Sequence, residues 1–272
     1  MRNVTIPLGT LVIIVAATLM ISATPAMSQT PAYKAPRTAD GKPNLNGIWQ
    51  AFNDANWDIE AHAAAPGPIP ITGAIGATPP GPGVVEGGAI PYQAWALDKK
   101  KENYKNRLSL DPEVKCYLPG VPRAAYMPQP FQIFQTSKDL LIAYQYAGAV
   151  RTIYMNNPGS APADSWMGWS VGRWEGDTLV IDVTSLGEDT WFDRAGNFHS
   201  DALHVVERYT PISADHLLYE ATIEDSKVFT RPWKISMPLY RRVEKNARLM
   251  EFKCVEFVEE LMYGHLRKQP AK

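Results

Sequence analysis

The chain has 272 residues, of which 20% are charged, with a formal net charge of -1 and a pI near 6.5. A chain of this length can bury one substantial core, and all-β barrels of this size are commonly single domains. The near-zero charge offers no basic face for nucleic acid or for an anionic membrane. The composition therefore predicts a small-molecule partner, near-neutral or an anion held by a local arginine, and no nucleic-acid partner.

The first 28 residues have the pattern of a secretory signal peptide. A short basic start, Met1-Arg2, precedes an almost unbroken apolar run over residues 8–23, and Ala26-Met27-Ser28 is a small-x-small cleavage pattern. The alternative is an uncleaved anchor, because the run approaches the ~18 apolar residues of a spanning helix. We expect cleavage, a periplasmic or secreted mature chain of residues 29–272, and no stable membrane insertion.

Export changes the interpretation of the two cysteines, Cys116 and Cys254. An even number of cysteines in an oxidising compartment favours a disulfide, which here would connect an insert to the last strand. Two buried free thiols are the alternative, since spacing alone does not bring the Cα atoms within bonding range.

Residues 53–130 are predicted to form an irregular insert within a single β-barrel domain. The segment up to residue 91 is rich in Pro, Gly and Ala without a helical or strand period, which is typical of a loop or lid. A short helix is expected at residues 94–107. Five prolines between residues 111 and 130 then favour extended chain.

The remainder of the chain consists largely of segments with period-two alternation. The central pair, residues 168–174 and 178–184, is joined by Glu175-Gly176-Asp177, a hairpin signal because Gly can take positive φ. Further strands are expected at residues 131–136, 140–146, 150–155, 204–209, 216–223, 233–240 and 249–255, with a short closing helix at 256–264. About ten strands with short connectors predict an all-β fold, an antiparallel up-and-down barrel around a cavity, with a two-sheet sandwich as the alternative.

Four segments of the chain form a distinctive set: PRTADGKPNLNGIW, PFQIFQTSKDLLIAYQYAGAVRTIYM, GRWEGDTLVID and DRAGNFHSDALHVVERY. Together they resemble a largely uncharacterised family of exported bacterial proteins with a lipocalin-like β-barrel, and the first segment contains the Gly-x-Trp that opens the first strand of such barrels. The resemblance implies a barrel with a cavity for a small, mostly apolar molecule. It does not assign a function, because one fold hosts many functions.

Acid–base candidates are concentrated in the second half of the chain, within and between β-strand patterns. His204, His199, Asp182 and Asp193 are the candidate catalytic residues, because a carboxylate can orient an imidazole and raise its basicity. Asp182 or Asp201 is the expected partner of His204, whereas Glu207 should face the opposite side of the strand. The structural alternatives are a surface or core histidine, and aspartates that accept backbone hydrogen bonds at turns.

Candidate binding residues are an arginine and several aromatic side chains. Arg151 is expected on an apolar strand face, where it must find an anion, either a protein carboxylate or the carboxylate of a ligand. Aromatic side chains are more often core than ligand platform, but a cavity for an aromatic ligand would use them. The aromatic candidates are Tyr144, Tyr154, Trp169, Trp191 and Tyr219.

The sequence predicts neither a metal nor an organic cofactor. His199 and His204 with a carboxylate could bind zinc or iron, but their spacing matches no strong ligand pattern. Phosphate-cradling and dinucleotide-binding glycine motifs are absent from the sequence.

Two functions from different classes fit these residues. The first is a cofactor-independent acid–base enzyme, a lyase such as a decarboxylase or dehydratase, or an isomerase, acting on an apolar or aromatic, possibly carboxylated substrate. The second is a non-catalytic carrier of a small hydrophobic ligand. The number of ionisable groups in the central stretch favours the enzyme.

Overall fold

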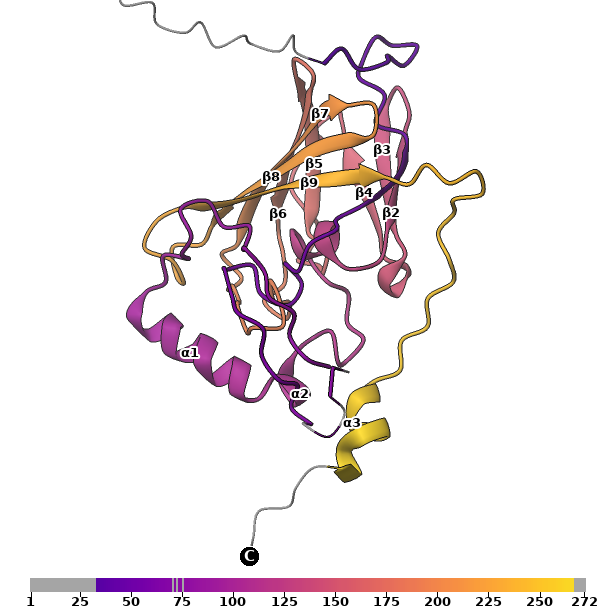
Figure 1. Cartoon of the computed structure of the whole chain (residues 1–272). Coiled ribbons are helices and arrows are strands. Elements are labelled where there is room, and N and C mark those ends of the chain that lie inside the picture. Colours follow the sequence, from indigo (N-terminus) through magenta and orange to yellow (C-terminus); the bar gives the residue numbers. More distant parts are fainter. Residues whose placement is uncertain (1–32, 70, 72, 75, 267–272) are drawn as a thin grey trace, which may run out of the picture. The chain divides into compact units, whose positions relative to one another are not determined.

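The computed structural model describes residues 33–69, 71, 73–74 and 76–266 (Figure 1). The predicted signal peptide lies outside the described residues. Nine strands close into a barrel, which confirms the all-β barrel prediction with nine strands in place of about ten. They are β1 Gly47–Gln50, β2 Phe131–Gln135, β3 Asp139–Tyr144, β4 Val150–Tyr154, β5 Trp169–Glu175, β6 Thr178–Thr184, β7 His204–Ser213, β8 His216–Glu224 and β9 Trp233–Arg241.

Each strand pairs with the next along the chain, and β9 pairs with β1 to complete the ring. All pairs are antiparallel except β4 and β5, which are parallel. This exception to the predicted antiparallel pattern has a topological cause, because an odd number of strands cannot alternate in direction all the way around a closed ring. The connection over residues 155–168 is long enough to return the chain to the same end of the barrel.

The central hairpin forms as predicted, with a slightly shorter turn. Glu175 pairs with Thr178, so the loop consists of Gly176 and Asp177, and Gly176 has a φ of +60°. On β6, the side chains of Leu179, Ile181 and Val183 are fully buried, while Asp182 is partly exposed. The period-two alternation thus places the apolar face inside the barrel.

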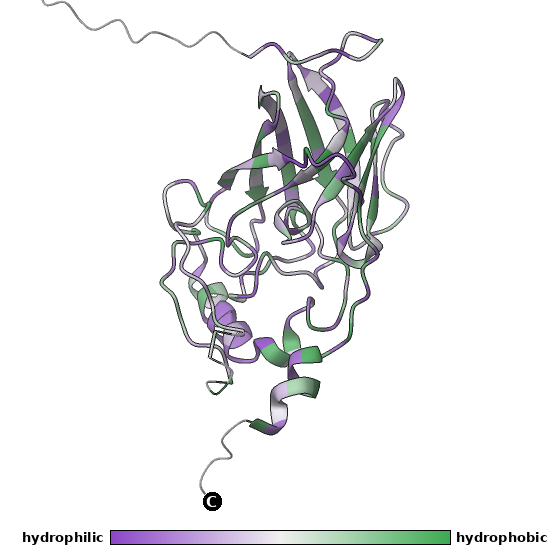
Figure 2. Cartoon of the chain, turned by 45° about the vertical axis from the view of Figure 1, so that its right-hand side comes forward, coloured by the Kyte–Doolittle hydropathy of each residue, from purple (hydrophilic) through white to green (hydrophobic). Residues whose placement is uncertain are grey.

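The barrel interior is packed with apolar and aromatic side chains from all sides. Figure 2 shows hydrophobic (green) stretches interspersed with hydrophilic (purple) ones along the strands, as expected where one face of a strand is buried and the other is exposed. Interior residues alternate with outward ones along β7, β8 and β9, as in Leu217, Tyr219, Ala221 and Ile223 of β8, each at most 1% exposed. This filled core holds the barrel as one rigid scaffold.

The strand predicted at residues 249–255 is absent, and this segment is irregular. Its alternating side chains resemble a strand pattern, but the pairing of β1 with β9 leaves no free sheet edge for it to join. Residues 242–266, here called the tail, instead leave the barrel after β9. They end in α3 Val258–Tyr263 and the short helix η4 Gly264–Leu266, close to the predicted closing helix.

The insert is largely irregular, as predicted. It contains α1 Ala94–Lys105, α2 Arg107–Leu110 and the single-turn helix η2 Arg123–Tyr126, and another such turn, η3 Tyr146–Gly148, links β3 to β4. Figure 1 shows α1, α2 and α3 beyond the same end of the barrel, so the insert and the tail meet there.

A disulfide connects Cys116 of the insert to Cys254 of the tail, with Cα atoms 5.7 Å apart. This confirms the predicted bridge, although its second half lies in the irregular tail and not in a strand. In the described part of the chain, no helix combines the length and apolar character needed to span a membrane.

Candidate functional site

The predicted anchor Arg151 lies inside the barrel, where it finds a protein carboxylate. Its guanidinium forms an ion pair with Glu207 of β7, and its Nε donates to Ser170 Oγ at 2.7 Å. The hydroxyl groups of Tyr209 and Tyr219 donate to Oε1 of the same glutamate at 3.1 and 2.9 Å. All these side chains are nearly fully buried. Of the two anions that the sequence left open, the structure thus provides the one within the protein.

The predicted pair of His204 and Asp182 forms on the outer face of the barrel. Nε2 of His204 lies 3.0 Å from Asp182 Oδ1, and Nδ1 lies 3.2 Å from Glu224 Oε2. Partial burial disfavours the imidazolium, but hydrogen bonds to Glu224 and Asp182 outweigh it and raise the pKa of His204. Glu207 faces the opposite side of β7, as expected from their spacing. This histidine therefore bridges two strands at the surface.

Asp193 and His199 lie in the connection between β6 and β7. The buried Asp193 carboxylate accepts hydrogen bonds from the backbone N–H groups of Ile59 and Ala195, both at 2.9 Å, and from the Asn197 amide at 2.6 Å. Burial and the nearby Asp58 carboxylate raise the pKa of Asp193 to about 7. This aspartate joins the insert to the β6–β7 connection.

His199 is held as a neutral imidazole. Its Nδ1 lies 2.9 Å from the carbonyl oxygen of Ser200, which can only accept, so Nδ1 carries the proton. Nε2 then accepts from the Thr190 hydroxyl at 2.7 Å. Burial lowers the pKa of His199, in keeping with the neutral form. Both ring nitrogens thus have partners within the protein.

The predicted aromatic residues are divided among three places. Tyr144 and Tyr219 lie in the barrel interior, each next to another ring, at centroid distances of 5.5 Å from Phe131 and 4.9 Å from Tyr209 respectively. Tyr154 and Trp169 pack together at 4.6 Å on the outer face. Trp191 is buried in the β6–β7 connection. The structure does not bring the ten predicted site residues together around one space.

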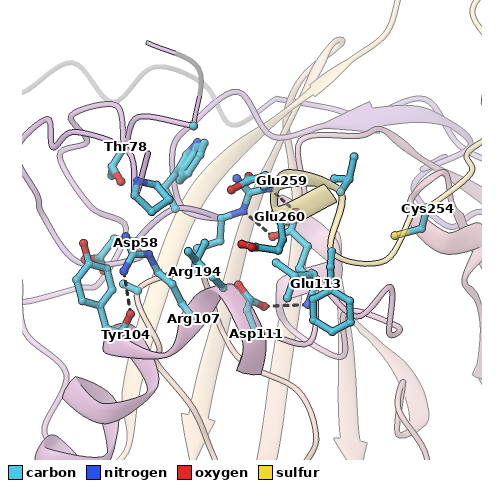
Figure 3. Close-up of a pocket in the computed structure, with 18 of the residues that line it drawn as sticks. Asp58, Thr78, Tyr104, Arg107, Asp111, Glu113, Arg194, Cys254, Glu259 and Glu260 are labelled. Atoms are coloured by element: carbon cyan, nitrogen blue, oxygen red, sulfur yellow. Dashed lines mark hydrogen bonds and ion pairs between the residues drawn. The ribbon is translucent and has the colours of Figure 1, made fainter. Parts of the chain in front are cut away.

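A cavity of about 500 Å³ lies instead where the insert meets the tail (Figure 3). We call it the end cavity. One wall is the insert loop around His62 and Thr78, whose ends are joined by paired backbone hydrogen bonds between Ala65 and Thr78. The opposite wall is the tail. Its aromatic lining consists of Trp57, Tyr104, Tyr146, Phe252 and Phe257.

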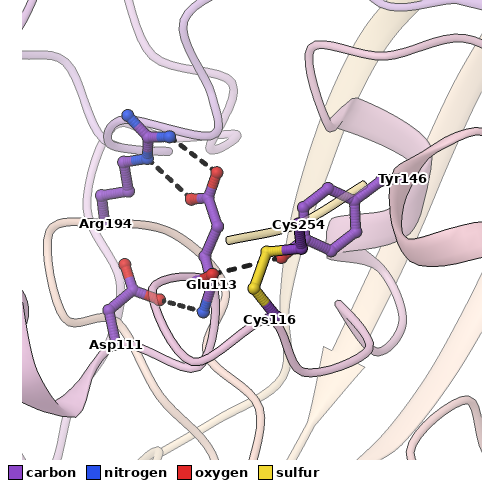
Figure 4. Close-up of a disulfide and its surroundings, with 6 residues drawn as sticks. All are labelled: Asp111, Glu113, Cys116, Tyr146, Arg194 and Cys254. Carbon is purple, nitrogen blue, oxygen red and sulfur yellow. Dashed lines mark hydrogen bonds and ion pairs between the residues drawn. A yellow bond between two sulfur atoms is a disulfide. The ribbon is translucent and has the colours of Figure 1, made fainter. Parts of the chain in front are cut away.

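The tail is fixed over the cavity by two connections near Cys254. The disulfide joins it to Cys116, and the backbone N–H of Phe257 donates to the carbonyl of Val114 at 2.8 Å. Figure 4 shows the disulfide beside Tyr146, while the carboxylate of Glu113 points away from it toward Arg194. The covalent bond therefore closes one side of the end cavity.

The floor of the end cavity is a network of ion pairs. Arg194 binds Glu113 through two hydrogen bonds of 2.6 Å, and the fully buried Arg123 contacts Glu113 at 2.8 Å and Asp111 at 3.2 Å. Burial opposes ionisation of Glu113, but the two guanidinium groups lower its pKa to about 2. Arg194 also lies over the ring of Trp57, 4.2 Å from its centroid. These charges hold one another and shape the floor.

Asp58 is the acidic side chain in the cavity wall with a displaced pKa and no ion-pair partner among the described residues. Burial raises the pKa of Asp58, although the backbone N–H of Glu60 donates to it at 3.0 Å. The neighbouring Lys100 is paired with the Glu60 side chain at 2.6 Å. Asp58 can therefore keep its proton to higher pH than an exposed carboxyl group.

Arg107 and Tyr104 form the side of the cavity next to α2. The guanidinium of Arg107 stacks on the Tyr104 ring, 4.1 Å from its centroid, and Nη1 donates to the Tyr104 carbonyl at 2.9 Å. No carboxylate lies within ion-pair distance of Arg107 among the described residues. Figure 3 shows Arg107 and Tyr104 in the lining of the end cavity.

Another hollow, of about 980 Å³, lies between the tail and the barrel wall near Ile48. Its lining comes mainly from exposed polar residues of the tail, and its Arg242 is paired with Glu244 at 2.7 Å. It has no aromatic wall. The end cavity is therefore the better candidate for a binding site.

Apart from Cys254, the residues that line the end cavity were not among the candidates identified from the sequence. Glu113 and Arg194 are far apart along the chain, and no periodicity relates them. The one usable signal was the disulfide, because a bridge from Cys116 to Cys254 places the tail against residues 111–117.

Comparison with protein-family models, with curated proteins and with solved structures finds no significant match. In the described residues, no group of three or more histidine, cysteine, aspartate or glutamate side chains is placed to hold a metal ion. The end cavity is therefore the feature of this protein that indicates a function.

Proposed function

We propose that the protein binds a small, largely apolar or aromatic molecule in the end cavity. The observation that carries this proposal is the aromatic lining of a space of about 500 Å³. Ligand pockets typically measure ~300–1,000 Å³ and combine apolar walls with a few polar groups. The barrel interior offers less support, because Arg151 and Glu207 are paired there among closely packed side chains.

The ionised groups on the cavity floor support binding more than chemistry. Glu113, Arg194 and Arg123 already satisfy one another, so their main effect is to keep Trp57 and the neighbouring walls in place. A carrier of a hydrophobic molecule needs this combination of rigid apolar walls and fixed polar groups.

An acid–base enzyme, of the lyase or isomerase type, is the second candidate. Asp58 favours it, because partial burial raises the pKa of this carboxyl group, and a carboxyl that keeps its proton to higher pH can deliver that proton to a bound substrate. His204, Asp182, His199 and Asp193 do not line the end cavity. Replacing Asp58 by Asn should abolish turnover of a bound substrate and leave its affinity within about tenfold. Full turnover by this variant would reject Asp58 as the acid–base group.

We also propose that the mature chain works in the periplasm or outside the cell. The Cys116–Cys254 disulfide supports this, since cytosolic thiols are normally kept reduced. Fractionation of cells that express the full chain should place the shortened protein outside the cytoplasm. Recovery of full-length protein from the cytoplasm alone would contradict export.

The binding proposal is tested by native mass spectrometry of the disulfide-bonded protein with a set of apolar and aromatic molecules. Val114→Trp, in the cavity wall, should fill the space and weaken every bound compound at least tenfold. Val243→Trp, at an exposed position of the tail that does not line the cavity, is the matched control and should bind normally. Equal binding by both variants would place the site elsewhere.

A further inference from the structure

We propose that Arg107 is the anchor for a carboxylate group on the ligand, so that the end cavity selects aromatic carboxylates. This inference rests on the proposed binding function and names its ligand class. It starts from the charges that line the cavity, because a charged group without a partner in the protein is available to a ligand.

The other cations in the lining have carboxylate partners. Lys100 is paired with Glu60 at 2.6 Å, Arg194 with Glu113 at 2.6 Å, and Lys253 with Glu251 at 3.2 Å. Within the described residues, Arg107 has no carboxylate within 4.0 Å. The guanidinium of Arg107 is therefore the positive charge of this wall that a ligand anion can meet.

The guanidinium of Arg107 is also held in an orientation that suits an anion. Stacking on Tyr104 and the hydrogen bond from Nη1 to the Tyr104 carbonyl use one face and one donor of the guanidinium. A planar guanidinium has five N–H donors in a fixed fork, so the remaining donors suit the two oxygens of a carboxylate. Because Arg107 is already oriented, less conformational entropy is lost when the ligand binds.

The aromatic side chains of the cavity walls indicate that the ligand contains an aromatic ring. Tyr104 lies directly beside Arg107, and Trp57, Tyr146 and Phe252 line the same cavity. Flat rings gain contact area and edge or offset stacking with such side chains. A molecule with one aromatic system and one carboxylate matches both features.

Asp58 and Glu259 offer the competing possibility of a cationic ligand, because both carboxylates line the cavity. Burial raises the pKa of Asp58, and Lys100 lies close enough to counter its charge. Asp58 therefore attracts a ligand cation less than an isolated carboxylate would. The experiment below includes an amine probe to test for a cationic ligand.

The experiment compares three probes of similar shape, 2-naphthoate, 2-naphthamide and 2-naphthylmethylamine, by fluorescence titration at low salt. We expect the native protein to bind naphthoate about tenfold more tightly than naphthamide, the usual scale of a charge-assisted hydrogen-bond pair. In Arg107→Gln, naphthoate should lose about tenfold in affinity, while the affinity for naphthamide stays within about twofold.

Two further variants make the result specific. Arg107→Lys keeps the charge but loses the planar fork, so it should retain only part of the naphthoate preference. Arg173→Gln, on the outer barrel wall and paired with Glu175, should bind all three probes as the native protein does. If Arg107→Gln does not fold, Arg107→Lys carries the test.

An unchanged naphthoate preference in the Arg107 variants, or tightest binding of the amine, would overturn the inference while leaving the binding function intact. If none of the three probes binds the native protein, or if Val114→Trp does not weaken them, the binding proposal itself fails for aromatic ligands and the inference fails with it.

Discussion

Arg151 and Glu207 meet inside the barrel, where both side chains are about 98% excluded from solvent and two tyrosine hydroxyls complete the carboxylate's hydrogen bonds. Their strands, β4 and β7, are not neighbours in the sheet. The ion pair therefore spans the barrel interior and connects walls that the backbone ladder does not join directly.

Breaking this pair should destabilise the protein strongly. Arg151→Met leaves the Glu207 charge buried with only hydroxyl and neutral partners, and such a loss typically costs about 3–5 kcal/mol in free energy of unfolding. The double variant Arg151→Met/Glu207→Leu should recover part of this, since no uncompensated charge remains. Urea denaturation of the disulfide-bonded protein measures the free energies of unfolding.

The exposed pair of Arg173 and Glu175 is the matched control, and Arg173→Met should cost less than about 1 kcal/mol. A similar small cost for Arg151→Met would show that the interior pair does not hold the barrel together.

Glu113 should make stability depend on pH in the acid range. Its pKa is lowered from 4.5 to about 2 in the folded protein, so its contribution is present above pH 4.5 and is lost as the pH falls through 2. Glu113→Gln should cost roughly 3 kcal/mol at pH 7, the order expected from that displacement of the pKa. The difference from the native protein should shrink between pH 4.5 and 2.

Denaturation curves at pH 7, 4 and 3 for both proteins provide this comparison. Glu251→Gln removes an exposed tail carboxylate and serves as the control. A cost for Glu113→Gln that stays constant across these pH values would contradict the role of the two arginines.

His204 should act in the opposite direction. Its folded pKa lies above the unfolded value of 6.5, so its contribution is complete below pH 6.5 and disappears as the pH rises through the folded pKa. His204→Gln should therefore lower the melting temperature more at pH 5.5 than at pH 9. Because the site is partly exposed, the effect should correspond to less than about 1 kcal/mol.

Thermal melts at the two pH values measure the effect, with His265→Gln at an exposed position as control. If His204→Gln lowers the melting temperature equally at both values, the interaction with Asp182 and Glu224 does not depend on the imidazolium.

The disulfide should control the tail locally. Replacing both Cys116 and Cys254 by serine removes the covalent link that closes the end cavity, and native disulfides typically contribute about 2–5 kcal/mol. We expect backbone amide hydrogen exchange to become fast in residues 250–266. The amides of the barrel strands should remain as protected as in the native protein. Unchanged exchange in the tail would mean that contacts such as Phe257 N–H to Val114 suffice to hold it.

The barrel could be predicted because period-two alternation and hairpin turns are local properties. The faces of β6 and the opposite orientation of His204 and Glu207 followed directly from that period. The segment 249–255 shows the limit of this reasoning, since alternation does not reveal that the pairing of β1 with β9 has already closed the sheet.

The end cavity could not be predicted in the same way. The Pro- and Gly-rich insert has no period from which its path can be read, and Glu113 contacts Arg194 across 81 positions of the chain. Arg151 shows a related limit. The sequence predicted it on an apolar strand face, but whether its anion is a ligand or Glu207 depends on strands that are not adjacent in the sheet.

The most direct test of the account is a crystal structure of the disulfide-bonded protein with bound 2-naphthoate. The account predicts the naphthalene ring in the end cavity, among Trp57, Tyr104 and Phe252, with the carboxylate on Arg107. Ligand density inside the barrel, next to Arg151 and Glu207, would contradict it.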